Sequence, residues 1–212
     1  MKRSLSKIKY LLAGLFLAAG LGLFASCTSE IEVELKKDGS VDVKFNGSSG
    51  NAFAALNSLN ADTVIFDTKE IEYEMAQKAF SNVKASSKTG NDLTVTMTDK
   101  NGKSALFTSG VVTVEKGILK ASLSPQSLKK FYDSADSQTL QFLDMLLSPV
   151  FNDEVMSQEE YLELLASFYG DEIAQEIADS SFRITLIQSD GSKKVQSISF
   201  AKLLTLNEVI RF

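Results

Sequence analysis

Carboxylates are the residues of this chain best suited to chemistry, since the sequence contains no histidine and a single cysteine. Without histidine, neither a Ser-His-Asp nor a Cys-His nucleophile can form, and the usual histidine-bearing zinc sites are excluded. Carboxylate chemistry, Lys or Tyr chemistry and all-oxygen calcium or magnesium sites remain. The densest group of acids consists of Asp153, Glu154, Glu159, Glu160, Glu163, Asp171, Glu172 and Glu176.

Two of these acids, Glu159 and Glu163, are spaced i, i+4 and share one face of a predicted helix, where they could form a hydrolase pair or a cation site. Glu160 instead completes a capping box with Ser157, and acids in a first helical turn are favoured by the helix dipole. The sequence has no D-x-[DN]-x-[DN]-G loop, so it has no EF-hand. We therefore expect a solvated acidic face, with no catalytic residue, no metal ion and no cofactor.

The first residues of the chain have the pattern of an export signal. Basic side chains come first, and a run without charge, rich in Leu, Phe, Ala and Gly, follows from Leu11 to Ala25. A basic start before an apolar run of about 7–15 residues is typical of a secretory signal. A permanent membrane span would need ~20 apolar residues, and this run is shorter.

The segment Leu23-Phe24-Ala25-Ser26-Cys27 resembles the lipobox of bacterial lipoproteins. Ala25 and Ser26 fit the small-residue positions of that family, whereas Phe24 stands where Leu, Val or Ile is usual. The resemblance implies that a diacylglycerol is attached to Cys27 and that residues 1–26 are removed. Two alternatives stay open: cleavage by the ordinary signal peptidase, which leaves an unpaired thiol, or an uncleaved anchor. In each case the domain faces outward from a bacterial membrane, on its periplasmic or surface side.

The composition of the mature chain argues against binding to nucleic acid. Removal of residues 1–26 leaves 18 of the 22 basic residues against all 27 acidic ones, a formal charge of −9 instead of −5. Such a charge repels phosphate backbones, which require clustered Lys and Arg. A single cysteine allows no internal disulfide, so burial of apolar side chains must hold the fold together.

Hydrophobic periodicity predicts one α+β domain over residues 31–212, behind a short tether at 27–30. Ile31, Val33 and Leu35 alternate with polar residues, as in a half-buried strand. A three-residue loop at Lys37-Asp38-Gly39 pairs Leu35 with Val41 and keeps both apolar faces together, whereas a two-residue loop would divide them. We therefore predict the three-residue loop, with Gly39 in the left-handed conformation.

The sequence of the middle of the chain predicts two short helices, followed by strands. One helix is expected at 52–59, and another begins at Asp67 and carries its apolar face as far as Val83. Four alternating stretches at 93–97, 105–107, 112–114 and 119–123 suggest an antiparallel meander, because their connections are too short for parallel crossovers.

A helical block follows over about 124–179, before the C-terminal hairpin. It begins at Ser124-Pro125 and includes the capping box at Ser157. The hairpin is expected to turn at Ser189-Asp190-Gly191, to pair 182–186 with 198–200, and to share a sheet with the first hairpin. Lys193-Lys194 beside this turn is interpreted as a charged tip that blunts an edge strand.

The helical block carries more apolar side chains than one narrow stripe needs. Surplus apolar surface indicates burial on two sides, a partner surface or a lipid pocket. The candidate hydrophobic binding surface consists of Phe142, Leu146, Leu162, Phe168 and Tyr169. The sequence thus suggests a membrane-anchored envelope lipoprotein that acts as a non-catalytic binding or assembly module, with an envelope protein or lipid as partner. A carrier of lipids or small hydrophobes is the alternative, and a carboxylate-dependent glycan hydrolase is a third.

Overall fold

The computed structural model describes residues 28–51, 66–132 and 155–212 of the chain. The segment expected to be an export signal, with Cys27, lies outside the described residues, as does the helix expected at 52–59.

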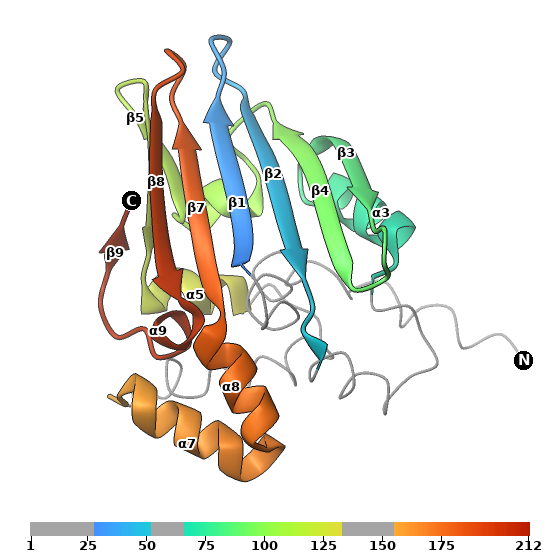
Figure 1. The fold of residues 1–212 in the computed structure, drawn as a ribbon. Helices are drawn as coiled ribbons and strands as arrows, with labels where there is room; N and C mark the ends of the chain where they lie inside the picture. The colour runs from blue at the N-terminus through green and yellow to red at the C-terminus, as the bar shows by residue number, and fades with distance from the viewer. Residues whose placement is uncertain (1–27, 52–65, 133–154) are drawn as a thin grey trace, which may run out of the picture.

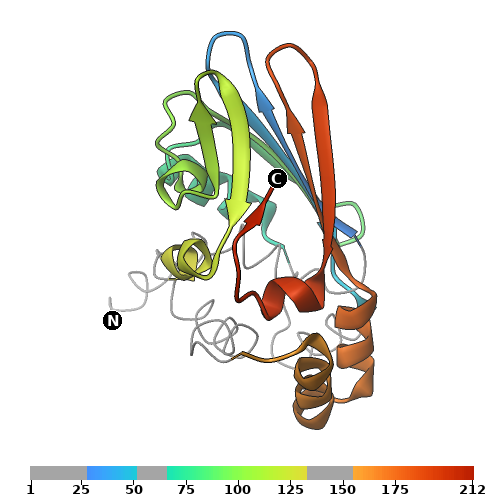
Figure 2. The same cartoon turned by 90° about the vertical axis from the view of Figure 1, so that its left-hand side faces the viewer.

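Two β-sheets pack face to face in the described part of the chain, and helices lie around them (Figure 1 and Figure 2). The strands of the six-stranded sheet, in spatial order, are β3 (Ser81–Ser86), β4 (Asp92–Asp99), β2 (Val41–Ser48), β1 (Thr28–Leu35), β7 (Ser181–Ile187) and β8 (Lys193–Ser199). The strands of the three-stranded sheet are β5 (Val112–Glu115), β6 (Ile118–Leu123) and β9 (Ile210–Arg211). The α+β fold class predicted from the sequence is confirmed.

The first and last hairpins share the larger sheet, as expected. Strand β1 lies parallel to β7, with Ile31 opposite Ile184 and Val33 opposite Leu186, and the other neighbours in this sheet are antiparallel. The residues expected to form a tether, 28–30, instead belong to β1, since Thr28 already pairs with Ser181.

The register of the first hairpin is the predicted one. Leu35 lies opposite Val41, and the backbone N–H of Lys36 donates to the carbonyl oxygen of Ser40 over 2.8 Å, which leaves three residues in the loop. Gly39 has a φ of +86°. A non-glycine residue is strained there, so the glycine helps to fix the register and, with it, which side chains face the core.

The predicted four-strand meander is wrong. Strand β4 pairs with β2 and β3, whereas β5 and β6 form a pair in the other sheet, with Val112 opposite Ala121. The stretch between them, expected to be a strand, is the short helix α4 (Ala105–Thr108), which buries Leu106 rather than its two neighbours. A run of so few residues has no periodicity that separates a strand from a helical turn.

Helix α3 (Thr68–Gln77) begins as predicted and ends earlier. The carboxylate of Asp67 accepts hydrogen bonds from the backbone of Lys69 and Glu70 at 3.0 and 3.1 Å, which caps the first turn. Ala79 then adopts a φ of 67°, which stops the helix, and Val83 lies in β3 instead of on the helix.

The helices described in the helical block are α5 (Pro125–Tyr132), α7 (Gln158–Tyr169) and α8 (Asp171–Asp179). Helix α7 carries the predicted capping box, in which Ser157 and Glu160 exchange hydrogen bonds of 2.9 and 3.1 Å. The C-terminal hairpin has its predicted three-residue loop, since Gln188 N–H donates to the Ser192 carbonyl oxygen over 2.9 Å. Phe200, expected in the last strand, instead begins helix α9 (Phe200–Leu204), which Ser199 caps.

The core lies between the two sheets, and the opposite face of the larger sheet is open to solvent (Figure 1). Buried side chains of β1, β2, β4 and β7 face α9 and the smaller sheet; among them are Val33, Phe45, Val95 and Leu186. From the facing side, Leu123 of β6, Phe200 of α9 and Phe212 after β9 complete this core. The outward-facing positions of the same strands carry Glu32, Asp42, Lys44 and Thr96.

Candidate binding surfaces

Four chain connections meet at one end of the two sheets, and we call this the tip end. They are the β1–β2, β5–β6 and β7–β8 turns and the loop from β4 to α4; the three turns project together in both views, while α7 and α8 lie at the opposite end (Figure 1 and Figure 2). An open groove of about 460 Å³ runs between the connections. Its apolar lining includes Phe107 and Val114, and its charged lining is Lys36, Lys37 and Lys100.

The β1–β2 and β7–β8 turns are built alike. Each has the sequence Asp-Gly-Ser, and each aspartate accepts a hydrogen bond from the backbone of the serine two residues later: Ser40 to Asp38 at 3.0 Å and Ser192 to Asp190 at 2.9 Å. The serine side chains and backbones hold the pKa of both aspartates below the ordinary value. The two aspartates thus stabilise the conformation of their own turns.

The loop from β4 to α4 is organised by a buried carboxylate. Asp99 accepts backbone hydrogen bonds from Asn101, Gly102 and Ser104 at 2.8, 2.8 and 2.9 Å, and a longer one of 3.4 Å from Lys103. Burial would raise the pKa of Asp99, but the hydrogen bonds from Ser104 and the loop backbone outweigh it, so the pKa lies below its ordinary value. This acid fixes the position of the Lys100–Lys103 segment at the tip end.

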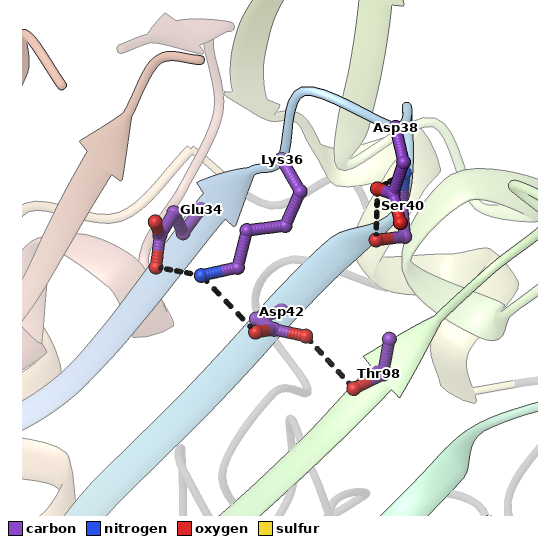
Figure 3. A network of polar contacts seen from close by, with 6 residues as sticks. All are labelled: Glu34, Lys36, Asp38, Ser40, Asp42 and Thr98. Carbon is purple, nitrogen blue, oxygen red and sulfur yellow. Dashed lines mark hydrogen bonds and ion pairs between the residues drawn. The ribbon is translucent and has the colours of Figure 1, made fainter. Parts of the chain in front are cut away.

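One lysine of the groove is already paired on the outer face of the larger sheet (Figure 3). The Nζ of Lys36 lies 2.7 Å from Glu34 Oε2 and 3.3 Å from Asp42 Oδ2, and Thr98 Oγ1 donates to Asp42 Oδ1 over 2.8 Å. The hydrogen bond to Glu34, followed by that to Asp42, raises the pKa of Lys36. The network links β1, β2 and β4 and neutralises Lys36.

Other lysines at the tip end are exposed and lack such partners. None of them lies within 4.0 Å of an acidic side chain of the described residues; they are Lys37, Lys100, Lys103, Lys116, Lys193 and Lys194. The sequence signal for them was available but missed, since a lysine pair precedes one Asp-Gly-Ser turn and follows the other. Their convergence depends on the parallel pairing of β1 and β7.

The hydrophobic surface expected on the helical block is only partly described. Phe142 and Leu146 lie outside the described residues, and Leu162 and Tyr169 are half-buried against the core. Burial raises the pKa of Tyr169. Phe168 is 71% exposed and lies on one helix face with Leu164, which is 36% exposed. Of the predicted surface, only Phe168 is therefore strongly exposed within the described residues, and Leu164, which was not predicted, forms a narrow stripe with it on α7.

The acids of α7 and α8 do not gather into a site within the described residues. Glu159, Glu163, Asp171 and Glu172 are exposed, and Asp153 and Glu154 lie outside the described residues. Glu160 serves the cap, and hydrogen bonds from Ser157 lower its pKa. Among the residues that the structure describes, no three Asp, Glu or Cys side chains are arranged to hold a metal ion.

A second hollow, enclosed between the two sheets, has a volume of only about 30 Å³. Its lining is apolar and includes Val33, Phe45, Leu123 and Ile184. Such a volume accommodates a few water molecules at most. The described residues thus form no cavity there of the size of a lipid.

The chain was compared with protein families, with curated proteins and with solved structures. No protein-family model, no curated protein and no solved structure matches it. Across 28–51, 66–132 and 155–212, none of the helices has the length and apolar character required to cross a membrane.

Proposed function

We propose that this chain is a lipoprotein of a bacterial cell envelope, held to the membrane by a lipid on Cys27, that acts without catalysis by binding a partner at its tip end. The observation that carries the proposal is the position of β1. This strand begins at Thr28, directly after Cys27, and runs through the middle of the sheet to the tip end (Figure 1). Eight strand residues span roughly 26 Å, so a lipid on Cys27 would keep the groove about that far from the bilayer.

The shape of the tip end supports binding there. Connections held by a rigid scaffold are the usual place for recognition, because they can vary without disturbing the core. Here Asp99 and the two Asp-Gly-Ser turns fix the connections, and the groove between them lies within the roughly 300–1,000 Å³ range of small-molecule sites. The Leu164–Phe168 stripe on α7 offers a second contact surface, at the opposite end.

The anchor is tested by replacing Cys27 with Ser and fractionating cells. The expected result is release of the protein from the membrane fraction, together with loss of incorporated fatty acid. Ser26→Ala is the matched control, since it keeps a small residue before Cys27 and should leave membrane association unchanged. Unchanged membrane association of Cys27→Ser would refute the lipid anchor.

The binding end is tested with a photo-crosslinking amino acid placed at Lys37 or, as the control, at Lys69 on α3. Both positions are exposed, but only Lys37 lines the groove. Adducts in intact cells are expected at position 37 and not at position 69. Adducts at both positions in equal amount, or at neither, would contradict binding at the tip end.

A further inference from the structure

Lysines occur at each of the four connections of the tip end, close to a glycine with positive φ. The glycine φ angles are 86° at Gly39, 64° at Gly102, 78° at Gly117 and 84° at Gly191, and their lysine neighbours are Lys37, Lys103, Lys116 and Lys193. The turns bring lysines from distant parts of the sequence around one groove. Lys100 lines this groove with Lys37, and Lys103 and Lys116 directly follow and precede its lining glycines.

The acids of the tip end have other partners. Asp38 and Asp190 are hydrogen-bonded within their turns, Asp99 is buried, and Glu115 pairs with Lys120 at 2.6 Å. Asp38 and Asp190 remain ionised, but the six exposed lysines outnumber these two exposed aspartates and remain available to an external anion.

The opposite end of the molecule has the opposite charge. Helices α7 and α8 together carry seven acids and no Lys or Arg. Since the field of a protein steers charged ligands, an anion is attracted to the tip end and repelled from the helical end. This asymmetry of charge favours the binding of an anion at the tip end, although the chain as a whole is acidic.

The lysines are suited to a ligand with repeated charges. A lysine ammonium is a mobile point charge, in contrast to the rigid, bidentate guanidinium of arginine, and neither Arg183 nor Arg211 lines the groove. Each exposed ion pair is weak, so several must act together. A linear polyanion provides such repeated contacts, whereas a single small anion does not.

The uncharged lining of the groove fits a sugar chain. Phe107 and Val114 offer apolar contact to the C–H face of a sugar ring, and Asn101 and Ser189 offer polar groups to its hydroxyls. No atom lies within 4 Å of the positions that Cβ atoms would occupy at Gly39 and Gly117, so a ligand can approach the backbone there. We propose that the tip groove binds a linear anionic glycan of the envelope, an inference that rests on the proposed function for the location of its ligand.

The test is a titration of the mature protein, purified in neutral detergent, with an octasaccharide of galacturonic acid at low ionic strength. The wild type should bind it, and binding should weaken as salt is added. Replacing the four lysines Lys37, Lys100, Lys103 and Lys116 by Gln should weaken binding at least about tenfold, because several weak ion pairs are lost together. Melting curves of the variant confirm that it remains folded.

The matched control replaces four exposed lysines elsewhere, Lys44, Lys69, Lys84 and Lys88, by Gln and should change the affinity less than about twofold. Equal losses in both variants, or no binding by the wild type, would overturn the inference. Binding of octaglutamate as tight as that of the octasaccharide would also overturn it, in favour of an acidic protein as ligand. The same titration on Cys27→Ser protein separates the two proposals, since loss of the anchor leaves the groove intact.

Discussion

Replacing Asp99 by Ala tests whether this one carboxylate organises the loop of the tip end. Asp99 accepts hydrogen bonds from four backbone N–H groups. Only the N–H of Ser104 belongs to a fully buried residue and cannot form a hydrogen bond with water instead. A hydrogen bond to a charged group contributes about 1.5–3 kcal/mol, and the exposed donors of Asn101 and Gly102 contribute less once water replaces the acceptor. We expect Asp99→Ala to lower the free energy of unfolding by about 3 kcal/mol, which corresponds to a Tm lower by roughly 6–12 °C in a domain of this size.

The assay is chemical unfolding followed by circular dichroism, with Asp92→Ala as the matched control. Asp92 likewise accepts backbone hydrogen bonds, from Lys88 and Thr89 at 3.0 and 2.6 Å, but these donors are exposed. Its replacement should therefore lower the Tm by less than half as much. Equal losses for the two variants would refute the reasoning that the buried N–H of Ser104 decides the cost.

The pH dependence of a further variant, Asp99→Asn, gives an independent check. Hydrogen bonds hold the pKa of Asp99 in the folded state below its unfolded value of about 3.9. Its stabilisation is therefore complete above that pH and is lost as the pH falls through the folded pKa. The difference in stability between wild type and Asp99→Asn should narrow below about pH 4; a difference that stays constant down to pH 3 would mean that the charge has no part in it.

Three further predictions concern single positions. Gly39→Val should lower the free energy of unfolding by about 2 kcal/mol through backbone strain alone, since nothing lies near the added side chain; an unchanged denaturation midpoint would contradict the three-residue loop. Ala79→Gly should raise the free energy of unfolding by about 0.5–1 kcal/mol, because Ala79 has a φ of 67°, which glycine adopts without strain. A lower free energy of unfolding in the same assay would contradict that conformation. Phe168→Ser should change the free energy of unfolding by less than about 0.5 kcal/mol, since this side chain is 71% exposed. A large decrease in the free energy of unfolding would place Phe168 in a packed core.

Local structure could be predicted from the sequence where a residue type strongly favours one conformation or one hydrogen-bonding role. The three-residue loops, the capping box at Ser157 and the proline at the start of α5 all follow from short-range hydrogen bonding and steric preference. Gly39 could be placed because its φ leaves few alternatives to glycine.

Prediction failed where the residue type does not determine the backbone conformation. The stretch at 105–107 became a helix because the Asp99 loop and burial of Leu106, rather than any local preference, decide its shape. The end of α3 was missed because Ala79, an ordinary helix former, adopts a left-handed conformation.

The candidate site was missed because its lysines come from segments that are distant in the chain. Each lysine beside a turn looks like an ordinary solvated residue in the sequence, and Lys193-Lys194 was interpreted as protection of an edge strand. Only the pairing of β1 with β7 and the position of the smaller sheet bring these lysines to one end. Three residues of the hydrophobic surface proposed from the sequence lie in the described part of the chain, Leu162, Phe168 and Tyr169, and of these Phe168 alone is strongly exposed.

The parallel pairing of β1 with β7 has a consequence for the order of folding. The first strand finds one of its two neighbours about 150 residues further along the chain, at Ser181–Ile187. Contacts of such sequence separation form slowly, and until they form β1 is an unprotected edge that can pair with other chains. The larger sheet is therefore complete only after the C-terminal hairpin has been synthesised.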